Sequence, residues 1–223
     1  MSAGQSGAHE MSSASSDIAF TPAVKAVQAR RGSRGAYAKV EARGGFRTAI
    51  TPDLVAFLAQ VDTAYLATTS AAGQPYAQHR GGPKGFIRAL DERTLAFADY
   101  SGNRQYITTG NLAENPRAFL FLMDYAHQRR IKLWGTARVV EDTELATDLM
   151  PEGYRARPEQ AILFTVEAWD ANCPQHIPQK IDAADAIRAL DERDARIAAL
   201  EAEIRRLRSA STRSADQIQE GLR

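Results

Sequence analysis

The sequence has one cysteine, four histidines and no long apolar run, and each shortage excludes a class of protein. A lone cysteine, Cys173, cannot form an internal disulfide, so the chain is not a disulfide scaffold and suits a reducing compartment. The histidines are scattered and only His176 has a cysteine nearby, so no zinc-ligand pattern is present and no metal is expected. No stretch approaches the roughly 18 apolar residues of a membrane-spanning helix.

An excess of charge of one sign is also missing, because 28 basic and 27 acidic residues leave a formal net charge of +1. This balance argues against a general nucleic-acid binder and against a membrane-surface binder. The first residues hold no apolar core of a secretory signal, and they carry the acidic Glu10 and Asp17. We therefore expect a cytoplasmic protein in which residues 1–20 form a disordered tail.

Helix and strand signals divide the rest of the chain. Thr21-Pro22 and Thr51-Pro52 each predict a helix start, because threonine caps a helix and proline suits its first position. After these helices the apolar runs shorten, and we expect strands at 63–70, 76–80, 86–90, 94–98, 118–123, 131–140 and 162–169. Short antiparallel strands joined by hairpins, with few helices between them, predict a mainly β protein built as a closed or split barrel.

The segment 91–124 carries the strongest candidate site. Its first strand ends in a turn over 99–103, and a helix is predicted over 104–112, before Pro116 forbids further helix. Such a turn exposes backbone N–H groups, and Arg104 just inside the helix start can bind phosphate oxygens. The segment therefore predicts an anion site, with a plain helix cap as the equally weighted alternative.

Two other places could meet a ligand. The loop 81–85 is rich in glycine and could pass close to a flat ring, with Lys84 pointing at an anion, or it could be a plain hairpin loop. His79 and Arg80 end a strand beside this loop and are candidate ligand contacts. The stretch 169–178 places Trp, Asn, Cys, Gln and His in one irregular loop, which is unusual for a mere linker.

A resemblance to a known family rests on three pieces of the chain: Asp91–Tyr100, Asn103-Arg104-Gln105 and Asn115-Pro116-Arg117. Together they resemble the FMN-binding split-barrel family typified by pyridoxamine 5′-phosphate oxidase, over residues 50 to 140. The motifs Gly-Asn-Arg-Gln-Tyr-Ile, Arg-Arg-Ile-Lys-Leu-Trp-Gly and Asn-Cys-Pro-Gln-His-Ile-Pro favour its uncharacterised flavin-nucleotide-binding branch. The resemblance implies an FMN-binding split β-barrel, a homodimer with the flavin at the subunit interface, and oxidoreductase activity supplied by the flavin.

The resemblance also implies how the cofactor would be bound. Asn103, Arg104 and Arg88 would contact its phosphate, while Gln105 stands where the family carries a phosphate-binding lysine. The strand over 84–87 would line the ring with its backbone. One positive charge of the family's phosphate site is therefore missing from this chain.

Other candidates would reach the ring itself. Arg130 stands where the family has a glutamine; facing the ring it would stabilise the reduced flavin, and otherwise it is a solvated charge. Gln175 and His176 would reach the flavin edge or a substrate from the neighbouring subunit. No catalytic residue is predicted. The full set of candidate cofactor residues is Lys84, Gly85, Phe86, Ile87, Arg88, Asp99, Asn103, Arg104, Gln105, Arg130, Trp169, Gln175 and His176.

The substrate stays open. The chain lacks the Arg-Leu-x-Pro segment that binds substrate in the oxidases, so vitamin B6 is not expected, and a nicotinamide nucleotide is one candidate electron donor. A deazaflavin-dependent reductase shares the fold class and is the first alternative. A haem-binding split-barrel protein with His176 as axial ligand is the second. The third is a non-enzymatic flavin-binding or interaction protein that works through its C-terminal helix.

We expect three parts after the tail: a split-barrel flavin domain with N-terminal helices at 21–180, an amphipathic helix at 181–208, and a frayed tail at 209–223. The helix carries an apolar stripe of Ile187, Leu190, Ile197, Leu200, Ile204 and Leu207. Asp194 interrupts this stripe, so the helix is only a short candidate coiled coil. Its simplest partner is its own copy in a dimer.

Overall fold

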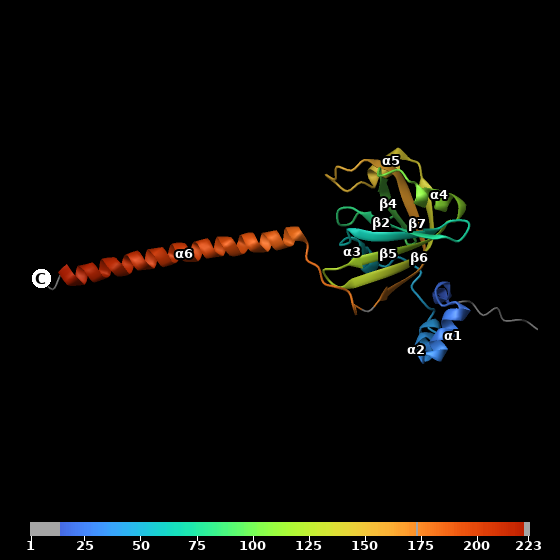
Figure 1. The fold of residues 1–223 in the computed structure, drawn as a ribbon, viewed down its shortest axis with the longest axis horizontal. Helices are drawn as coiled ribbons and strands as arrows, with labels where there is room; N and C mark the ends of the chain where they lie inside the picture. The colour runs from blue at the N-terminus through green and yellow to red at the C-terminus, as the bar shows by residue number, and fades with distance from the viewer. Residues whose placement is uncertain (1–13, 173, 221–223) are drawn as a thin grey trace, which may run out of the picture. The chain divides into compact units, whose positions relative to one another are not determined.

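The computed structural model describes residues 14–172 and 174–220, with side chains described as far as Ser209 apart from that of Asn172. It divides into two compact units, one ending at Ile177 and the other beginning at Pro178, and each is described by itself (Figure 1). The first unit contains a seven-stranded sheet, and the second consists mainly of one long helix.

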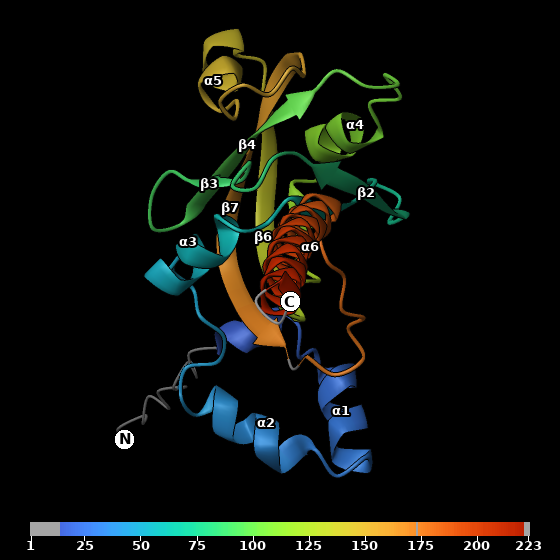
Figure 2. The ribbon, with the colours of Figure 1, turned by 90° about the vertical axis from the view of Figure 1, so that its left-hand side faces the viewer.

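The strands are β1 (Thr63–Thr69), β2 (Pro75–Gly81), β3 (Arg88–Ala89), β4 (Thr94–Tyr100), β5 (Arg117–Asp124), β6 (Arg129–Val140) and β7 (Pro158–Asn172). Every pairing is antiparallel, in the order β2-β1-β5-β6-β7-β4-β3. Figure 2 shows the long strands β6 and β7 running through the unit. The mainly β, split-barrel fold expected from the strand pattern is confirmed.

Apolar residues at alternate strand positions build the core. Leu66 of β1, Leu120 of β5 and Leu133 of β6 are fully buried, because successive side chains of a strand point to opposite faces. Helix α3 (Pro52–Leu58) packs Leu54 against this cluster. The predicted start of α3 is confirmed, since Thr51 Oγ1 accepts a hydrogen bond from the Leu54 amide.

Two smaller helices flank the sheet. They are α4 (Ile107–Glu114) and α5 (Thr143–Asp148). Asp142 caps α5 by accepting from the amides of Glu144 and Leu145. Ala146 and Leu149 then pack on β4 and β7 in a second, smaller core. This second core supports the end of β4, at which the candidate site begins.

Strand β3 differs from its prediction. The sequence predicts a strand over 86–90, but only Arg88 and Ala89 pair, with Ala96 and Leu95 of β4. Phe86 and Ile87 are instead buried in the core, with exposed fractions of 1% and 2%. The chain is still in a turn at this point, since Gly85 has a left-handed φ of 81° and the Phe86 amide donates a 3.1 Å hydrogen bond to the Pro83 carbonyl, so the ladder starts only after them.

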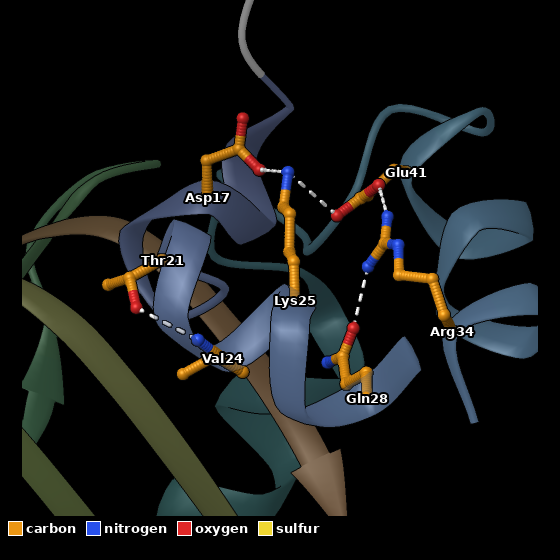
Figure 3. A network of polar contacts seen from close by, with 7 residues as sticks. All are labelled: Asp17, Thr21, Val24, Lys25, Gln28, Arg34 and Glu41. Carbon is orange, nitrogen blue, oxygen red and sulfur yellow. Dashed lines mark hydrogen bonds and ion pairs between the residues drawn. The ribbon is translucent and has the colours of Figure 1, made fainter. Parts of the chain in front are cut away.

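Three short helices precede the barrel: η1 (Ser15–Ile18), α1 (Pro22–Arg30) and α2 (Arg34–Glu41). A polar network joins them (Figure 3). Lys25 Nζ lies 2.7 Å from Asp17 Oδ1 and 3.1 Å from Glu41 Oε1. Arg34 pairs with Glu41 and also donates a 2.6 Å hydrogen bond to Gln28 Oε1.

The structure corrects the disordered tail expected over 1–20. Residues Ser15–Ile18 form the helix η1, and Ser15 Oγ donates to the Gly44 and Phe46 carbonyls, which holds this segment against the chain before the barrel. Phe20 also packs edge-on against Phe46, with ring centroids 5.2 Å apart. One hydroxyl and one aromatic ring do not stand out in a serine-rich stretch, so the sequence did not predict these two contacts. The other part of this predicted tail, 1–13, lies outside the described residues.

The last helix, α6 (Ala183–Glu220), is longer than the 181–208 expected. Residues 209–220, expected to fray, continue it, because no proline or glycine interrupts the chain before Gly221. The end of the predicted frayed tail, 221–223, lies outside the described residues. Across the described ranges, no helix is both long and apolar enough to cross a membrane.

A buried carboxylate closes the β5–β6 hairpin. Asp124 is 7% exposed and accepts hydrogen bonds from both Nε and Nη2 of Arg129, at 3.1 and 2.7 Å. It also accepts from the His127 amide at 3.0 Å. Burial alone would raise the pKa of the Asp124 carboxyl, but the bonds from Arg129 and His127 outweigh burial and lower it.

Asp124→Asn is therefore expected to lower the free energy of unfolding at neutral pH by about 1–3 kcal/mol. The pKa of Asp124 is lower in the folded protein than in the unfolded chain. The carboxylate therefore contributes fully to stability above the unfolded-state pKa, and this contribution is lost as the pH falls through the folded-state pKa. Urea unfolding of both proteins along an acid series is the measurement. The difference between the two stabilities should begin to shrink as the pH falls below about 4 and should go on shrinking through the depressed folded-state pKa; a constant difference across the series would contradict this role.

Candidate functional site

A cleft of about 700 Å³ opens where β2 and β4 end. It is lined by 78–82 at the end of β2, by 97–102 at the end of β4, and by Tyr154. A second hollow of about 310 Å³ shares Gln78 and Arg80 with it and continues over the turn 102–106 to α4. Strands β2 and β4 lie apart in the sheet order, so the two hollows occupy the open seam of the split barrel.

A charged network crosses this seam. Arg80 of β2 pairs with Asp99 of β4, and their side chains are only 12% and 11% exposed. Gln160 of β7 donates a 2.8 Å hydrogen bond to the second oxygen of Asp99. Gln78 accepts from Arg80 at 3.1 Å and from Thr108 of α4 at 2.8 Å. Both carboxylate oxygens of Asp99 are thus occupied by protein donors.

Two buried polar atoms in the cleft have no hydrogen-bond partner among the described residues: Arg80 Nε and Tyr100 Oη. Burial and the neighbouring Tyr154 raise the pKa of the Tyr100 hydroxyl, against the smaller opposing effect of Arg88. Tyr100 is therefore a neutral phenol at physiological pH and can donate a hydrogen bond. A buried N–H donor and a buried hydroxyl without partners are what a polar ligand would satisfy.

Arg104 lies at the mouth of the second hollow but not inside a helix. The expected helix 104–112 begins only at Ile107, because Arg104 and Tyr106 adopt left-handed φ angles of 60° and 51°. The Tyr106 hydroxyl donates a 2.6 Å hydrogen bond to Glu159, which secures this turn. Within the described part of the chain, no hydrogen bond or ion pair engages the exposed Arg104 guanidinium.

Of the other residues predicted to bind the phosphate, only some lie at the site. Asn103 and Gln105 line the second hollow, and the Asn103 side chain accepts from the Gln105 amide at 3.3 Å. Arg88 lines neither hollow. Its guanidinium donates to the backbone carbonyls of Asp148 and Met150, at 2.9 and 3.1 Å, at the C-terminal end of α5. The phosphate role expected for Arg88 therefore stays a prediction without support from this geometry.

Of the residues predicted to contact the flavin ring in the loop 84–87, only one lines the cleft. Phe86 lines the larger cleft, edge-on to Phe97 with centroids 6.1 Å apart. Lys84, Gly85 and Ile87 precede or follow it without lining the cleft, and Ile87 belongs to the core. Of the loop 84–87, the structure brings only the Phe86 ring to the site.

The remaining candidates lie at the other end of β7. Trp169 is a core residue, 1% exposed, whose Nε1 donates a 2.7 Å hydrogen bond to the Ala49 carbonyl. Arg130 is the second residue of β6 and is half-buried, while Gln175 and His176 are exposed in the turn after β7. Since β7 enters the site at its start, these residues do not line the cleft.

Among the site residues missing from the predicted set are Gln78, Tyr100, Thr108 and Gln160. The signal for Gln78 was its spacing from Arg80, since residues two apart in a strand share a face. Gln160 is a buried glutamine ahead of an apolar run, where a polar side chain needs a partner. Nothing local distinguishes Tyr100 or Thr108 from ordinary surface residues.

Comparisons with known proteins agree with this architecture. The pyridoxamine 5′-phosphate oxidase family model matches residues 50–173. No curated protein matches the chain.

Solved structures that resemble it include a Lactobacillus delbrueckii protein assigned as a pyridoxamine 5′-phosphate oxidase (19% identity, TM-score 0.43), which covers 56% of this chain and 95% of its own. The haem storage protein HutZ of Vibrio cholerae is 15% identical, with coverages of 54% and 93% and a TM-score of 0.37. An FAD binding protein of Mycobacterium smegmatis is 13% identical, with coverages of 56% and 97% and a TM-score of 0.38. Likeness this distant says nothing of this chain's ligand. The family match, however, spans more than half of the sequence, and the chain belongs to the pyridoxamine 5′-phosphate oxidase family.

Proposed function

We propose that this protein is an oxidoreductase that binds FMN in the seam of its barrel, with the phosphate at Arg104. The observation that carries this proposal is the Arg104 guanidinium, exposed and without a partner among the described residues, beside the unsatisfied Nε of Arg80. A bound flavin supplies hydride and single-electron chemistry that side chains lack. The protein's part is to bind it, orient it and exclude water.

Charge supports the phosphate assignment. Arg80 is neutralised by Asp99, so it offers one N–H donor but no net charge. Arg104 is the other arginine that lines the second hollow. Glu159 also lines it, but that carboxylate accepts from the Tyr106 hydroxyl, and among the described residues no ion pair joins it to Arg104. A guanidinium binds phosphate oxygens through charge-assisted hydrogen bonds, and Asn103 beside it adds an amide donor. Gln105 adds no charge, which makes Arg104 the main phosphate contact.

The larger cleft suits a flat ring. A Cβ on Gly82 would lie 3.0 Å from Phe86 Cβ and 3.2 Å from Tyr100 Oη, so the loop passes close to both aromatic residues only as glycine. Tyr100 and Tyr154 pack edge-on, with centroids 5.4 Å apart, and form one wall. The protonated Tyr100 hydroxyl is a donor for a carbonyl or ring nitrogen of the isoalloxazine.

A second copy of the chain would supply further contacts to the flavin. Arg130, Gln175 and His176 lie at the other end of β7, so they can reach a flavin only across the interface of a homodimer. There they would contact the ring edge and the substrate, with a nicotinamide nucleotide as electron donor. A haem protein is the second candidate, because the imidazole of His79 lines the larger cleft whereas His176 does not.

Arg104→Ala is expected to weaken the binding free energy of FMN by about 1.5–3 kcal/mol, because the charge-assisted phosphate contact is lost. Riboflavin lacks the phosphate, so its affinity should not change. Fluorescence titration with both ligands is the measurement, and Arg138→Ala, an exposed arginine on β6, is the matched control. Equal FMN affinity in the two variants would remove Arg104 from the site.

The absorbance spectrum of the purified full chain tests the proposal itself. A flavin spectrum, with FMN released on heating, supports it. A deazaflavin in the released material would favour the reductase alternative, and a Soret band would favour haem. A colourless protein that also refuses added FMN would contradict flavin binding altogether.

A further inference from the structure

Helix α6 presents an apolar stripe that a single helix leaves in water. Its described side chains are exposed from Ala183 to Ser209. Five of its six large aliphatic residues are between 46% and 55% exposed, namely Leu190, Ile197, Leu200, Ile204 and Leu207, and the sixth, Ile187, is 57% exposed. Helices of this kind gain most of their stability by packing such a stripe against another surface.

The spacing of the stripe identifies the surface that fits it. Leu190, Ile197 and Ile204 recur every seven residues and take the a positions of a heptad. Leu200 and Leu207 follow at three residues and take the d positions. β-Branched isoleucine at a with leucine at d is the combination that favours two parallel helices. Arg193 occupies the first d position, so the apolar seam becomes continuous only from Ile197.

The charges beside the seam agree with a second copy as the partner. Arg196 and Glu203 take g positions, and Glu201 and Arg208 take e positions. In a parallel, in-register pair each g residue faces the e residue five places later on the other helix. Arg196 then faces the partner's Glu201, and Glu203 faces the partner's Arg208. Both contacts join opposite charges.

We propose that α6 forms a parallel, in-register two-stranded coiled coil with α6 of a second copy of this chain. Glu203 already pairs with Arg206 of its own helix at 2.6 Å, and a carboxylate has room to accept from a second guanidinium. The barrel units of the two copies would then be tethered to the same end of the coil, each through its own residues 178–182. Such a tether brings them to about millimolar effective concentration. This inference does not rest on the proposed cofactor.

The seam is tested by sedimentation of the full chain over a dilution series. Ile197→Asp combined with Ile204→Asp places two charges in the seam and should raise the dimer dissociation constant by roughly 100-fold or more. Ala195→Asp combined with Ala202→Asp adds the same charges at the outward f positions, and should leave it unchanged. A monomeric wild-type protein, or equal dissociation constants for the two double variants, would overturn the proposal.

The orientation is tested by exchanging one charge pair. Glu203→Arg alone places like charges against the partner's Arg208 and should weaken the dimer. Adding Arg208→Glu restores opposite charges in a parallel coil, so the dissociation constant should return to the wild-type value. In an antiparallel coil e faces e and g faces g, so the double exchange would oppose Arg196 to arginine and Glu201 to glutamate. A double variant weaker than the single one would therefore overturn the parallel arrangement.

Discussion

Asp99→Ala is expected to lower the unfolding free energy by about 3 kcal/mol, because it leaves the Arg80 guanidinium without its carboxylate in a nearly buried position. It also removes the acceptor of the 2.8 Å bond from Gln160. The pair joins β2 and β4, which are not neighbours in the sheet, so it closes the seam in which we place the ligand. Urea unfolding is the measurement.

A matched control separates burial from charge. Glu167→Ala breaks another ion pair, with Arg117, whose side chains are 34% and 67% exposed, and it should cost no more than about 1 kcal/mol. In a double-mutant cycle, Arg80→Ala should recover part of the loss caused by Asp99→Ala, because it removes the unpaired charge. Additive losses would show that the two groups are not coupled across the seam.

Gly135→Ala is expected to cost about 3 kcal/mol or more, and it could prevent folding. Gly135 lies at a β-bulge where the β6–β7 register shifts. An added Cβ would collide with the Thr165 carbonyl oxygen and lie 3.0 Å from its carbon and 3.2 Å from Phe164 Cε1. Because backbone and a core ring cannot both give way, the two central strands would have to separate. Thermal unfolding or soluble yield measures the effect.

Gly110→Ala is the control for this substitution. Gly110 lies in α4, and an added Cβ there meets no atom within 4 Å. It should be neutral or stabilising by about 0.4–1 kcal/mol, since alanine restricts the unfolded chain. If both substitutions prove equally mild, the close approach of β7 to Gly135 does not exist in solution.

Local features of the chain could be predicted because they depend on near neighbours. Thr21 and Thr51 cap helices that begin at the following prolines. The strand at 118–123 needed only one residue more at each end to become β5. Capping and period-two alternation act within a few residues, so sequence order alone reveals them.

The candidate site could be predicted only in part. A turn was expected over 99–103 with a phosphate-binding arginine just after it, and Asn103, Arg104 and Gln105 do line one hollow. The helix start expected at Arg104 was wrong by three residues, because Arg104 and Tyr106 adopt left-handed backbone angles that no local pattern indicated. Trp169 was expected near the flavin, but it lies in the core, where its indole nitrogen satisfies the Ala49 carbonyl.

The sequence by itself determined the family, the β-rich barrel, the helix caps and the heptad spacing of α6, since each is written in residues close together along the chain. Only the tertiary structure decided which polar groups meet. Arg80, Asp99 and Gln160 come from three different strands and face one another because the barrel curves until β2 approaches β4. The same curvature carries Arg88 to the carbonyls at the C-terminal end of α5 instead. Such contacts depend on how distant segments pack, and packing is a property of the whole core.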